Sequence, residues 1–285
     1  MSLKQTVGAR LDVTGVTVRF SGVHVLEDVS FSAEPGTVHA LIGPNGAGKS
    51  SLFNVLSGIY RPLVGSVMID DQEVVGLKPF RVARVGIGRA FQNSSMFASL
   101  TVEENLLLGR HRLTRSGVIA GGLGLPSVRA EQRDARAKVR EIAEFLEIDH
   151  LLARTSGDLS YGDAKRVDVA RALCTEPRLL LLDEPAAGMH TKEKVAIRTA
   201  INQIARELGT TILLVEHDMG VVMGISDRIT VLDFGTVLIT SSPEEVRNDP
   251  RVIEAYLGHS SARKGLLSSR IDRPAPRRPG ARDKP

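Results

Sequence analysis

Short apolar runs recur along the chain and stand apart from the polar segments around them. Three of them, at 38–42, 179–182 and 211–215, consist almost entirely of aliphatic residues. Continuous runs of this kind are typical of parallel strands that are covered on both faces, because neither face then needs polar side chains. We therefore expect 179–182 and 211–215 to be parallel strands and 38–42 to be a buried strand.

Other segments show the period of a half-exposed strand. Residues 11–33 alternate between apolar and polar positions, with interruptions at 21–22 and 27–28, and predict an antiparallel subsheet ahead of the first apolar run. The segments 65–71 and 229–239 each predict a hairpin, the first with two adjacent aspartates in its turn. The chain thus begins with antiparallel strands and ends with a hairpin.

Helical spacing dominates the stretches between the strands. The pattern changes to helix at Thr101, and 129–148 predicts an amphipathic helix whose apolar positions recur at i, i+3, i+4 and i+7. The helix before the third apolar run has Gly209 as its stop signal. Ser-Pro-Glu-Glu at 242–245 is a capping box that opens the last helical region, expected to end at Gly258. The helices after Thr101 predict a helical subdomain inserted between two halves of the sheet.

The first apolar run leads into a glycine-rich loop of the pattern G-x-x-x-x-G-K-[ST], with a helical pattern after it. Glycines let consecutive backbone N–H groups turn toward a polyphosphate, and the following helix presents its positive end to the same anion. Lys49 would reach the β- and γ-phosphates, and the Ser50 hydroxyl would hold Mg²⁺. We interpret the loop as a nucleoside triphosphate site rather than a plain glycine-rich turn. Its residues are Gly43, Pro44, Asn45, Gly46, Ala47, Gly48, Lys49, Ser50 and Ser51.

Two acidic residues, Asp183 and Glu184, directly follow the second apolar run. Asp183 is expected to support the Mg²⁺ that Ser50 also holds, and Glu184 to polarise a water molecule against the γ-phosphate. Such a pair is often only a turn at the end of a strand, but downstream of a phosphate loop it favours hydrolysis. Another turn of small residues, containing Ser160 and Gly162, precedes a helical pattern and indicates a second phosphate contact.

Composition narrows the class of protein. The 285 residues are 42% hydrophobic, which is ordinary for a soluble globular chain. No window approaches the roughly 18–20 apolar residues of a membrane span, the glycine-rich patch at 117–126 included. The N-terminus lacks the apolar core of a signal peptide, so we expect a cytoplasmic protein. The single cysteine, Cys174, excludes an intramolecular disulfide, and its helical setting favours a buried thiol over a reactive one.

Positive charge gathers at the C-terminus. From residue 260 onward the chain has eight Lys or Arg and two Asp, together with four prolines. We expect 259–285 to be a basic, Pro-rich and disordered tail. Contact with anionic lipid or nucleic acid is one role open to it, and a solvated extension is the interpretation we favour.

With these motifs in order, residues of about 10–258 resemble the ATPase subunits of ATP-binding-cassette (ABC) transporters. The resemblance implies an α/β fold of the P-loop NTPase (RecA-like) type, with ATP and Mg²⁺ as cofactors. The parallel-sheet core would cover about 10–98 and 164–258, with an antiparallel β subdomain in it, and the helical subdomain about 99–163.

The resemblance also implies roles for individual residues. Phe20 occupies the place of the aromatic that stacks on adenine, and Gln92 that of a glutamine that touches Mg²⁺ and the attacking water. His217 matches the switch histidine that contacts the γ-phosphate. Ser160 and Gly162 match a motif that binds the γ-phosphate of ATP held by the other subunit of a dimer. The implied catalytic set is Glu184, His217, Gln92 and Lys49, and the implied metal set is Ser50, Gln92 and Asp183.

A finer resemblance, to the ATPases of branched-chain amino acid importers, rests on the segments 159–162, 183–188, 216–228 and 248–258. It implies that ATP hydrolysis powers the import of branched-chain amino acids or related small polar solutes. The implied partners are two transmembrane permease subunits, a second identical or paralogous ATPase subunit and, indirectly, a periplasmic or extracellular solute-binding protein. The implied location is peripheral, on the cytoplasmic face of the inner (plasma) membrane.

Two departures from the ABC pattern concern the rate of hydrolysis. Asp163 stands where the family usually has glutamine, and its charge would repel ATP unless Lys165 or Arg166 offsets it. His190 replaces the Asp or Asn that helps to couple the two sites of a dimer.

Four other interpretations are weaker. A lipopolysaccharide-export ATPase shares much of the pattern, and a non-hydrolysing regulatory cassette is disfavoured by the intact Lys49 and Glu184. A soluble cassette acting on ribosomes or DNA usually has two cassettes or a long coiled coil, which this chain lacks, so nucleic acid is an unlikely partner. The Asp-Phe-Gly sequence at 233–235 spells a kinase magnesium motif without its companion motifs and is interpreted as a hairpin turn.

Overall fold

The computed structural model describes residues 5–20, 22–90, 96–113 and 126–256. Its larger sheet has six strands in the order β10-β9-β3-β8-β7-β6. The five strands from β9 to β6 run parallel, and β10 is antiparallel to β9. The strands are β3 (Val38–Ile42), β6 (Ile87–Ala90), β7 (Leu179–Asp183), β8 (Thr211–Val215), β9 (Arg228–Asp233) and β10 (Thr236–Ser241).

The three apolar runs are the neighbouring strands β3, β8 and β7, and every residue in them is buried. The predicted parallel sheet is therefore confirmed. Burial on both faces explains why these strands need no alternation of polar side chains.

The smaller sheet is antiparallel, in the order β2-β1-β4-β5. Its strands are β1 (Leu11–Phe20), β2 (Val23–Ala33), β4 (Val64–Ile69) and β5 (Gln72–Glu73). The interruption expected at 27–28 is wrong, because β2 runs through it. A bulge replaces the break: three steps along β2, from Leu26 to Val29, face two steps along β1, and Asp28 takes a φ of 50°.

Both predicted hairpins are present. Asp70, with a φ of 52°, lies in the turn between β4 and β5. The Asp-Phe-Gly sequence forms the turn between β9 and β10, with a φ of 43° at Phe234 and 83° at Gly235. The kinase-like motif is thus a hairpin turn, as its isolation in the sequence predicts.

The helices differ from the sequence prediction mainly at their ends. They are α1 (Lys49–Leu56), α2 (Pro79–Val85), α3 (Val102–Arg110), α5 (Pro126–Phe145), α6 (Tyr161–Leu173), α7 (Thr191–Arg206), α8 (Met219–Ile225) and α9 (Pro243–Asn248). Short 3₁₀ turns occur at His111–Leu113, Asp149–Leu151 and Ser156–Asp158. The helix expected over 129–148 runs from Pro126 to Phe145, and α7 ends three residues before Gly209.

Capping explains where two helices begin. Thr101 and Glu104 form a capping box at the start of α3, and Ser242 and Glu245 form the predicted one at α9. Helical residues resume at 250–256 after α9 ends, and the expected end at Gly258 lies outside the described residues.

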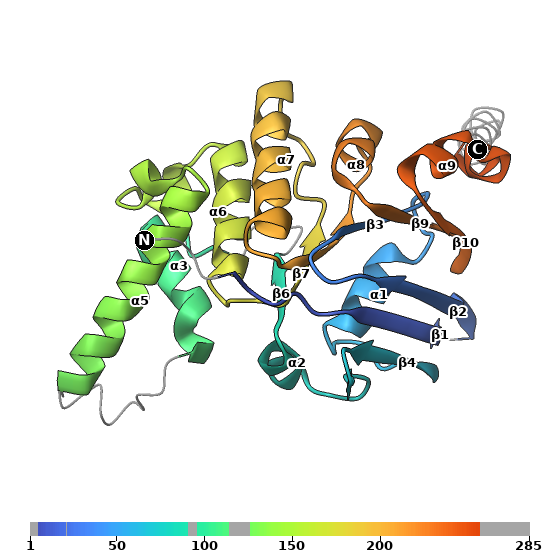
Figure 1. Ribbon diagram of the computed structural model, residues 1–285, viewed down its shortest axis with the longest axis horizontal. Coiled ribbons are helices and arrows are strands. Elements are labelled where there is room, and N and C mark those ends of the chain that lie inside the picture. Colours follow the sequence, from blue (N-terminus) through green and yellow to red (C-terminus); the bar gives the residue numbers. More distant parts are fainter. Residues whose placement is uncertain (1–4, 21, 91–95, 114–125, 257–285) are drawn as a thin grey trace, which may run out of the picture.

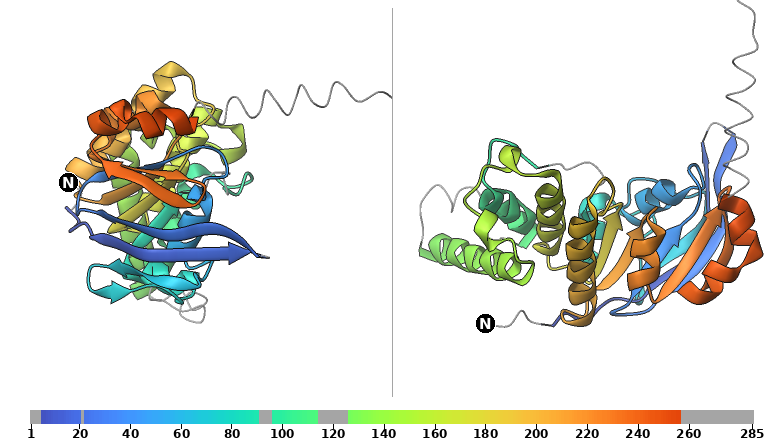
Figure 2. Two further views of the ribbon diagram at one scale, coloured as in Figure 1. Left: turned by 90° about the vertical axis from the view of Figure 1, so that its right-hand side faces the viewer. Right: turned by 90° about the horizontal axis from the view of Figure 1, so that it is seen from above.

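Helices α6, α7 and α8 cover one face of the larger sheet, whereas α1 and the smaller sheet lie on the other (Figures 1 and 2). In β7, Leu180 and Leu182 pack in the cluster that contains α6 and α7, whereas Leu179 and Leu181 pack with α1 and the antiparallel strands. Figure 1 shows α3, α5 and α6 gathered at one end of the molecule. The alternation along β7 thus shows that the larger sheet lies between two different layers.

Three remaining expectations concern membranes, the tail and the thiol. Within the described ranges, no helix is both long and apolar enough to cross a bilayer. The basic tail and most of the apolar patch at 117–126 lie outside those ranges. Cys174 is buried, and burial raises the pKa of its thiol to about 12, so the prediction of a buried, packed cysteine is confirmed.

Candidate nucleotide-binding site

The phosphate loop connects β3 to α1 and leaves the start of α1 open. Gly48 stands at the N-cap with a φ of 102°, and no side chain caps the helix. The first N–H groups of α1 are therefore free to bind an anion, which is the usual use of such a helix end. Asn45, Gly46 and Ser50 are exposed beside it, so a ligand can reach the loop.

Lys49 lies inside its own loop. Its Nζ donates hydrogen bonds to the carbonyl oxygens of Gly43 at 2.6 Å and Pro44 at 2.9 Å, and only 6% of the residue is exposed. Burial lowers the pKa of the ammonium group, while the nearby carboxylates of Glu184 and Asp183 act in the opposite direction. A cation that is held at the loop in this way suits a polyphosphate ligand.

Neighbouring strands hold the loop from the other side. The N–H of Gly235, in the β9–β10 turn, donates to the carbonyl of Ala47, and the Gly235 carbonyl accepts from Glu27 in β2. A Cβ on Gly43 would lie 2.1 Å from the carbonyl oxygen of Leu232, so only glycine fits there. The turn that resembles a kinase motif therefore supports the phosphate loop.

Asp183 ends β7 as predicted, and the structure adds a partner that sequence reasoning missed. Arg89 in β6 donates to Oδ2 of Asp183 at 3.0 Å and to the side chains of Asn54 and Ser57 in and after α1. Its guanidinium also lies 5.6 Å from the ring centroid of Phe53. Arg89 thus ties the acidic end of β7 to the helix of the phosphate loop. The sequence did hold one indication of this role, because Arg89 is the only charged residue in a four-residue strand of otherwise small or apolar residues.

Glu184 and His217 meet directly. The strands β7 and β8 are neighbours, and Nε2 of His217 lies 2.8 Å from Oε1 of Glu184. The Glu184 N–H donates to the carbonyl of Val215, and Glu184 has a φ of 52°. The two residues that the sequence places 33 positions apart therefore form one acid–imidazole pair.

Glu216, which the sequence analysis did not single out, is almost fully buried beside this pair. Its Oε1 accepts from the N–H of Ala186 at 2.6 Å, and its Oε2 accepts from the N–H of His217 at 3.1 Å. A longer contact of 3.5 Å runs from the N–H of Asp218 to Oε2. Burial raises the pKa of the carboxyl group, and the backbone donors oppose that shift. In the sequence, the only indication of a role for Glu216 is that this acidic residue directly precedes His217.

The second predicted phosphate contact belongs to another part of the chain. Ser160 caps α6, with its Oγ accepting from the N–H of Asp163 at 3.1 Å. Gly162 is packed so closely that an added Cβ would lie 2.1 Å from Oε1 of Glu193. In the described part of the chain, no hydrogen bond of Ser160 or Gly162 reaches the phosphate loop.

The two departures from the ABC pattern lie near the same place. Arg166 donates to the carbonyl oxygens of Leu146 and Glu147, so those bonds engage it away from Asp163. Lys165 is buried, with its Nζ 5.7 Å from the ring centroid of Tyr161. His190 is exposed at the N-cap of α7, where its N–H donates to Glu193.

The structure describes Phe20, the predicted adenine-stacking residue, but not Gln92, the predicted contact of Mg²⁺ and water. Phe20, at the end of β1, is 44% exposed and packs edge-to-face on Tyr60, with 5.0 Å between ring centroids. Sequence reasoning missed Tyr60, which supports the ring from the side. Gln92 lies outside the described residues.

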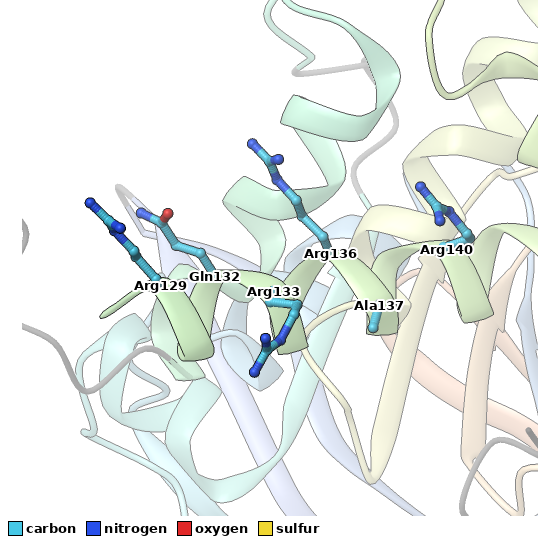
Figure 3. Close-up of a pocket in the computed structure, with 6 residues that line it drawn as sticks. All are labelled: Arg129, Gln132, Arg133, Arg136, Ala137 and Arg140. Carbon is cyan, nitrogen blue, oxygen red and sulfur yellow. The ribbon is translucent and has the colours of Figure 1, made fainter. Parts of the chain in front are cut away.

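A separate pocket lies on the surface of α5. Figure 3 shows it lined by Arg129, Gln132, Arg133, Arg136, Ala137 and Arg140. Figure 1 places α5 at the end of the molecule away from α1, so this pocket is distinct from the phosphate loop.

No group of three or more His, Cys, Asp or Glu that could hold a metal occurs among the residues with described positions. Magnesium is usually bound by one or two carboxylates together with phosphate oxygens of the substrate. The Ser50 hydroxyl and the Asp183 carboxylate fit such a site, with the nucleotide supplying the phosphate oxygens.

The glycine loop, its buried lysine and the acidic ends of the parallel strands define a P-loop nucleotide-hydrolysing fold. Residues 26–187 match the family described as ABC transporter, and residues 242–262 match the family described as branched-chain amino acid ATP-binding cassette transporter. The chain therefore belongs to the ABC transporter ATP-binding family, and it is an ATPase.

Curated relatives cover most of the chain. The sequence is 42% identical over 250 residues to the high-affinity branched-chain amino acid transport ATP-binding protein LivG of Escherichia coli K12, covering 88% of this chain and 98% of LivG. It is 40% identical to the corresponding protein BraF of Pseudomonas aeruginosa, with the same coverage.

Solved structures agree. The ADP conformation of MJ1267, an ATP-binding cassette of an ABC transporter, superposes with a TM-score of 0.77 at 30% identity, covering 88% of this chain and 99% of MJ1267. A nucleotide-free ATP-binding cassette gives a TM-score of 0.76 at 31% identity, covering 87% and 98%. The predicted family and the α/β P-loop fold are confirmed.

Proposed function

We propose that the chain hydrolyses ATP to power the import of branched-chain amino acids or related small polar solutes. The observation that carries the proposal is the match to LivG and BraF over 250 residues, because both are named as branched-chain amino acid transport proteins. The match of residues 242–262 to a C-terminal segment of such transporters supports it independently of the catalytic motifs.

Each candidate site residue has a role in this proposal. Lys49, already at the loop, would exchange its carbonyl partners for the β- and γ-phosphates. Ser50 and Asp183 would hold Mg²⁺, with Gln92 as a further ligand, and the ion would neutralise charge on the phosphate oxygens. Phe20 would stack on adenine. Together with the glycines and Ser51, these residues bind and orient the nucleotide.

Glu184 would orient and deprotonate the attacking water, and His217 would hold Glu184 and contact the γ-phosphate. Their 2.8 Å contact supports this pairing, since the imidazole is within hydrogen-bond reach of the carboxylate. A general base must lie close to the proton that it accepts, and Glu184 stands next to Asp183 at the same strand end.

A second ATPase subunit, identical or paralogous, would complete the site. Ser160 and Gly162 lie at the start of α6, and among the described residues neither forms a hydrogen bond to the phosphate loop of its own chain. Facing a partner's ATP, the α6 N-terminus would add N–H donors to its γ-phosphate. We further propose two transmembrane permeases, a solute-binding protein acting through them, and a peripheral location on the cytoplasmic face of the membrane.

Two measurements test the proposal. Glu184→Gln removes the proposed base and keeps the size of the side chain, so ATP hydrolysis should be abolished while ATP binding persists. Glu254→Gln, a surface exchange in the helical segment 250–256, is the matched control and should hydrolyse ATP at the original rate. Full ATPase activity of Glu184→Gln would remove Glu184 from the mechanism.

Transport needs its own test. The gene should be deleted in its host, and uptake of labelled leucine, isoleucine and valine measured against uptake of an unrelated sugar. Selective loss of amino acid uptake, restored by the wild-type gene and not by Glu184→Gln, is the expected result. Unchanged uptake of all three amino acids would refute the proposed cargo and leave the ATPase activity untouched.

A further inference from the structure

Glu216 connects two loops that otherwise belong to different strands. One loop, 184–189, follows β7 and begins with Glu184; the other follows β8 and begins with Glu216 and His217. The 2.6 Å bond from the N–H of Ala186 and the 3.1 Å bond from the N–H of His217 end on the two oxygens of one side chain. A single carboxylate thus spans the gap between the loops.

The chemistry of the site requires a carboxylate. Glu216 is 2% exposed, and burying a charge is costly unless hydrogen bonds compensate for it. An ionised carboxylate offers two acceptor oxygens, one for each N–H group. A glutamine offers one acceptor oxygen, and its NH₂ group would face the second N–H group donor to donor.

The same two loops fix the acid–imidazole pair. His217 Nε2 lies 2.8 Å from Glu184 Oε1, so a shift of either loop would lengthen that contact. The loop 184–189 also meets the α6 side of the protein, since a Cβ on Gly188 would lie 3.1 Å from the ring of Tyr161. The tie made by Glu216 therefore lies between the site at the phosphate loop and the residues beside Ser160.

We infer that Glu216 is a positioning residue for ATP hydrolysis, which holds Glu184 and His217 in register by tying their loops together. The inference rests on the proposed roles of Glu184 and His217. In the described part of the chain, the hydrogen bonds of the Glu216 carboxylate come from backbone N–H groups, so it would act through the backbone of Ala186 and His217.

Two variants of the full-length chain separate bridging from charge. Glu216→Gln keeps the length of the side chain and loses one acceptor, whereas Glu216→Asp keeps the charge and is one methylene too short to span both loops. Both should lower kcat about fivefold to a hundredfold, the range expected when one buried N–H loses its acceptor. The Kd for ATP should change by less than about twofold, because the phosphate loop is untouched.

Asp218→Asn is the matched control. Asp218 is a carboxylate in the same loop, but its side chain caps α8 and pairs with Lys194, and among the described residues none of its side-chain hydrogen bonds goes to the loop 184–189. Its kcat should stay close to that of the wild type, even if its melting temperature falls. Amide hydrogen exchange should quicken at residues 186–189 in both Glu216 variants and stay unchanged there in Asp218→Asn.

The outcomes are distinct. Normal kcat in either Glu216 variant, with Glu184→Gln inactive in the same assay, overturns the inference and leaves the proposed function intact. Activity in Glu184→Gln overturns the proposed site whatever Glu216 does. A fall in kcat of equal size for Asp218→Asn and the Glu216 variants would assign the effect to loop stability alone and would also overturn the inference.

Discussion

Replacing Arg89 with methionine tests how the acidic end of β7 is held to α1. The guanidinium group donates to Asp183, Asn54 and Ser57, and the side chains of the ion pair are only 11% and 5% exposed. Removing one partner leaves Asp183 as a buried charge without its cation, which typically costs about 3–5 kcal/mol. For a domain of this size, 1 kcal/mol corresponds to about 2–4 °C in melting temperature, so we expect a decrease of roughly 6–20 °C.

Urea denaturation of the nucleotide-free chain measures this loss directly. Asp183→Asn should also destabilise the protein, whereas the double variant with Arg89→Met should be more stable than the sum of the two single losses. The coupling free energy should exceed about 1 kcal/mol, because neither side chain is left as an unpaired buried charge once both have been replaced.

Arg206→Met is the control for a surface pair. Arg206 pairs with Asp227, but the two side chains are 53% and 30% exposed, so its loss should cost at most about 1 kcal/mol. If Arg89→Met cost no more than this control, or if the two single losses added within about 0.5 kcal/mol, the ion pair would not hold β7 to α1.

Three other substitutions test single features. Lys49→Met should raise the Kd for ATP about tenfold or more in calorimetric titration, since charged hydrogen bonds to phosphate are lost; an unchanged Kd would contradict its role. Gly43→Ala should lower the melting temperature more than Gly46→Ala, because only the first Cβ meets a backbone carbonyl, and equal losses would refute that steric argument. His39 is buried, which lowers its pKa from 6.5 to about 4. The unfolded chain therefore binds the extra proton first, so stability should decline as pH falls from about 6.5 to 4. His39→Gln should flatten that part of the urea-denaturation profile, and an unchanged slope would exclude His39 as its source.

Much of the fold could be predicted because its signals are local. The three aliphatic runs needed no long-range information to be identified as buried strands, and the glycine loop between β3 and α1 has its chemistry in nine adjacent residues. The same holds for the capping box at Ser242, where the residues that bond to each other are three apart.

Long-range partners could not be predicted from local patterns. Arg89 meets Asp183 because β6 and β7 are neighbours in the sheet, although the two residues are 94 positions apart. Glu216 reaches Ala186 across the gap between β8 and β7, and Tyr60 supports Phe20 from a different segment. The order of strands and the registers of their ends decide these contacts, and neither is written in a single segment.

The expected break at 27–28 was wrong for a related reason. Glu27 and Asp28 look like a turn, but Asp28 can adopt a positive φ and form a bulge inside a continuous strand. The choice depends on the pairing of β2 with β1, which places Leu26 and Val29 in the same core.

The carbonyl partners of Lys49 bear on how quickly the ATPase can be reused. An ammonium group that loses a phosphate inside a buried loop would normally be stranded, and that cost would slow the departure of the product. Here the oxygens of Gly43 and Pro44 stand 2.6 and 2.9 Å from Nζ and can take the phosphate's place. In the proposed mechanism the loop would exchange one set of acceptors for another, so the ammonium group would keep hydrogen-bond partners when nucleotide arrives or leaves.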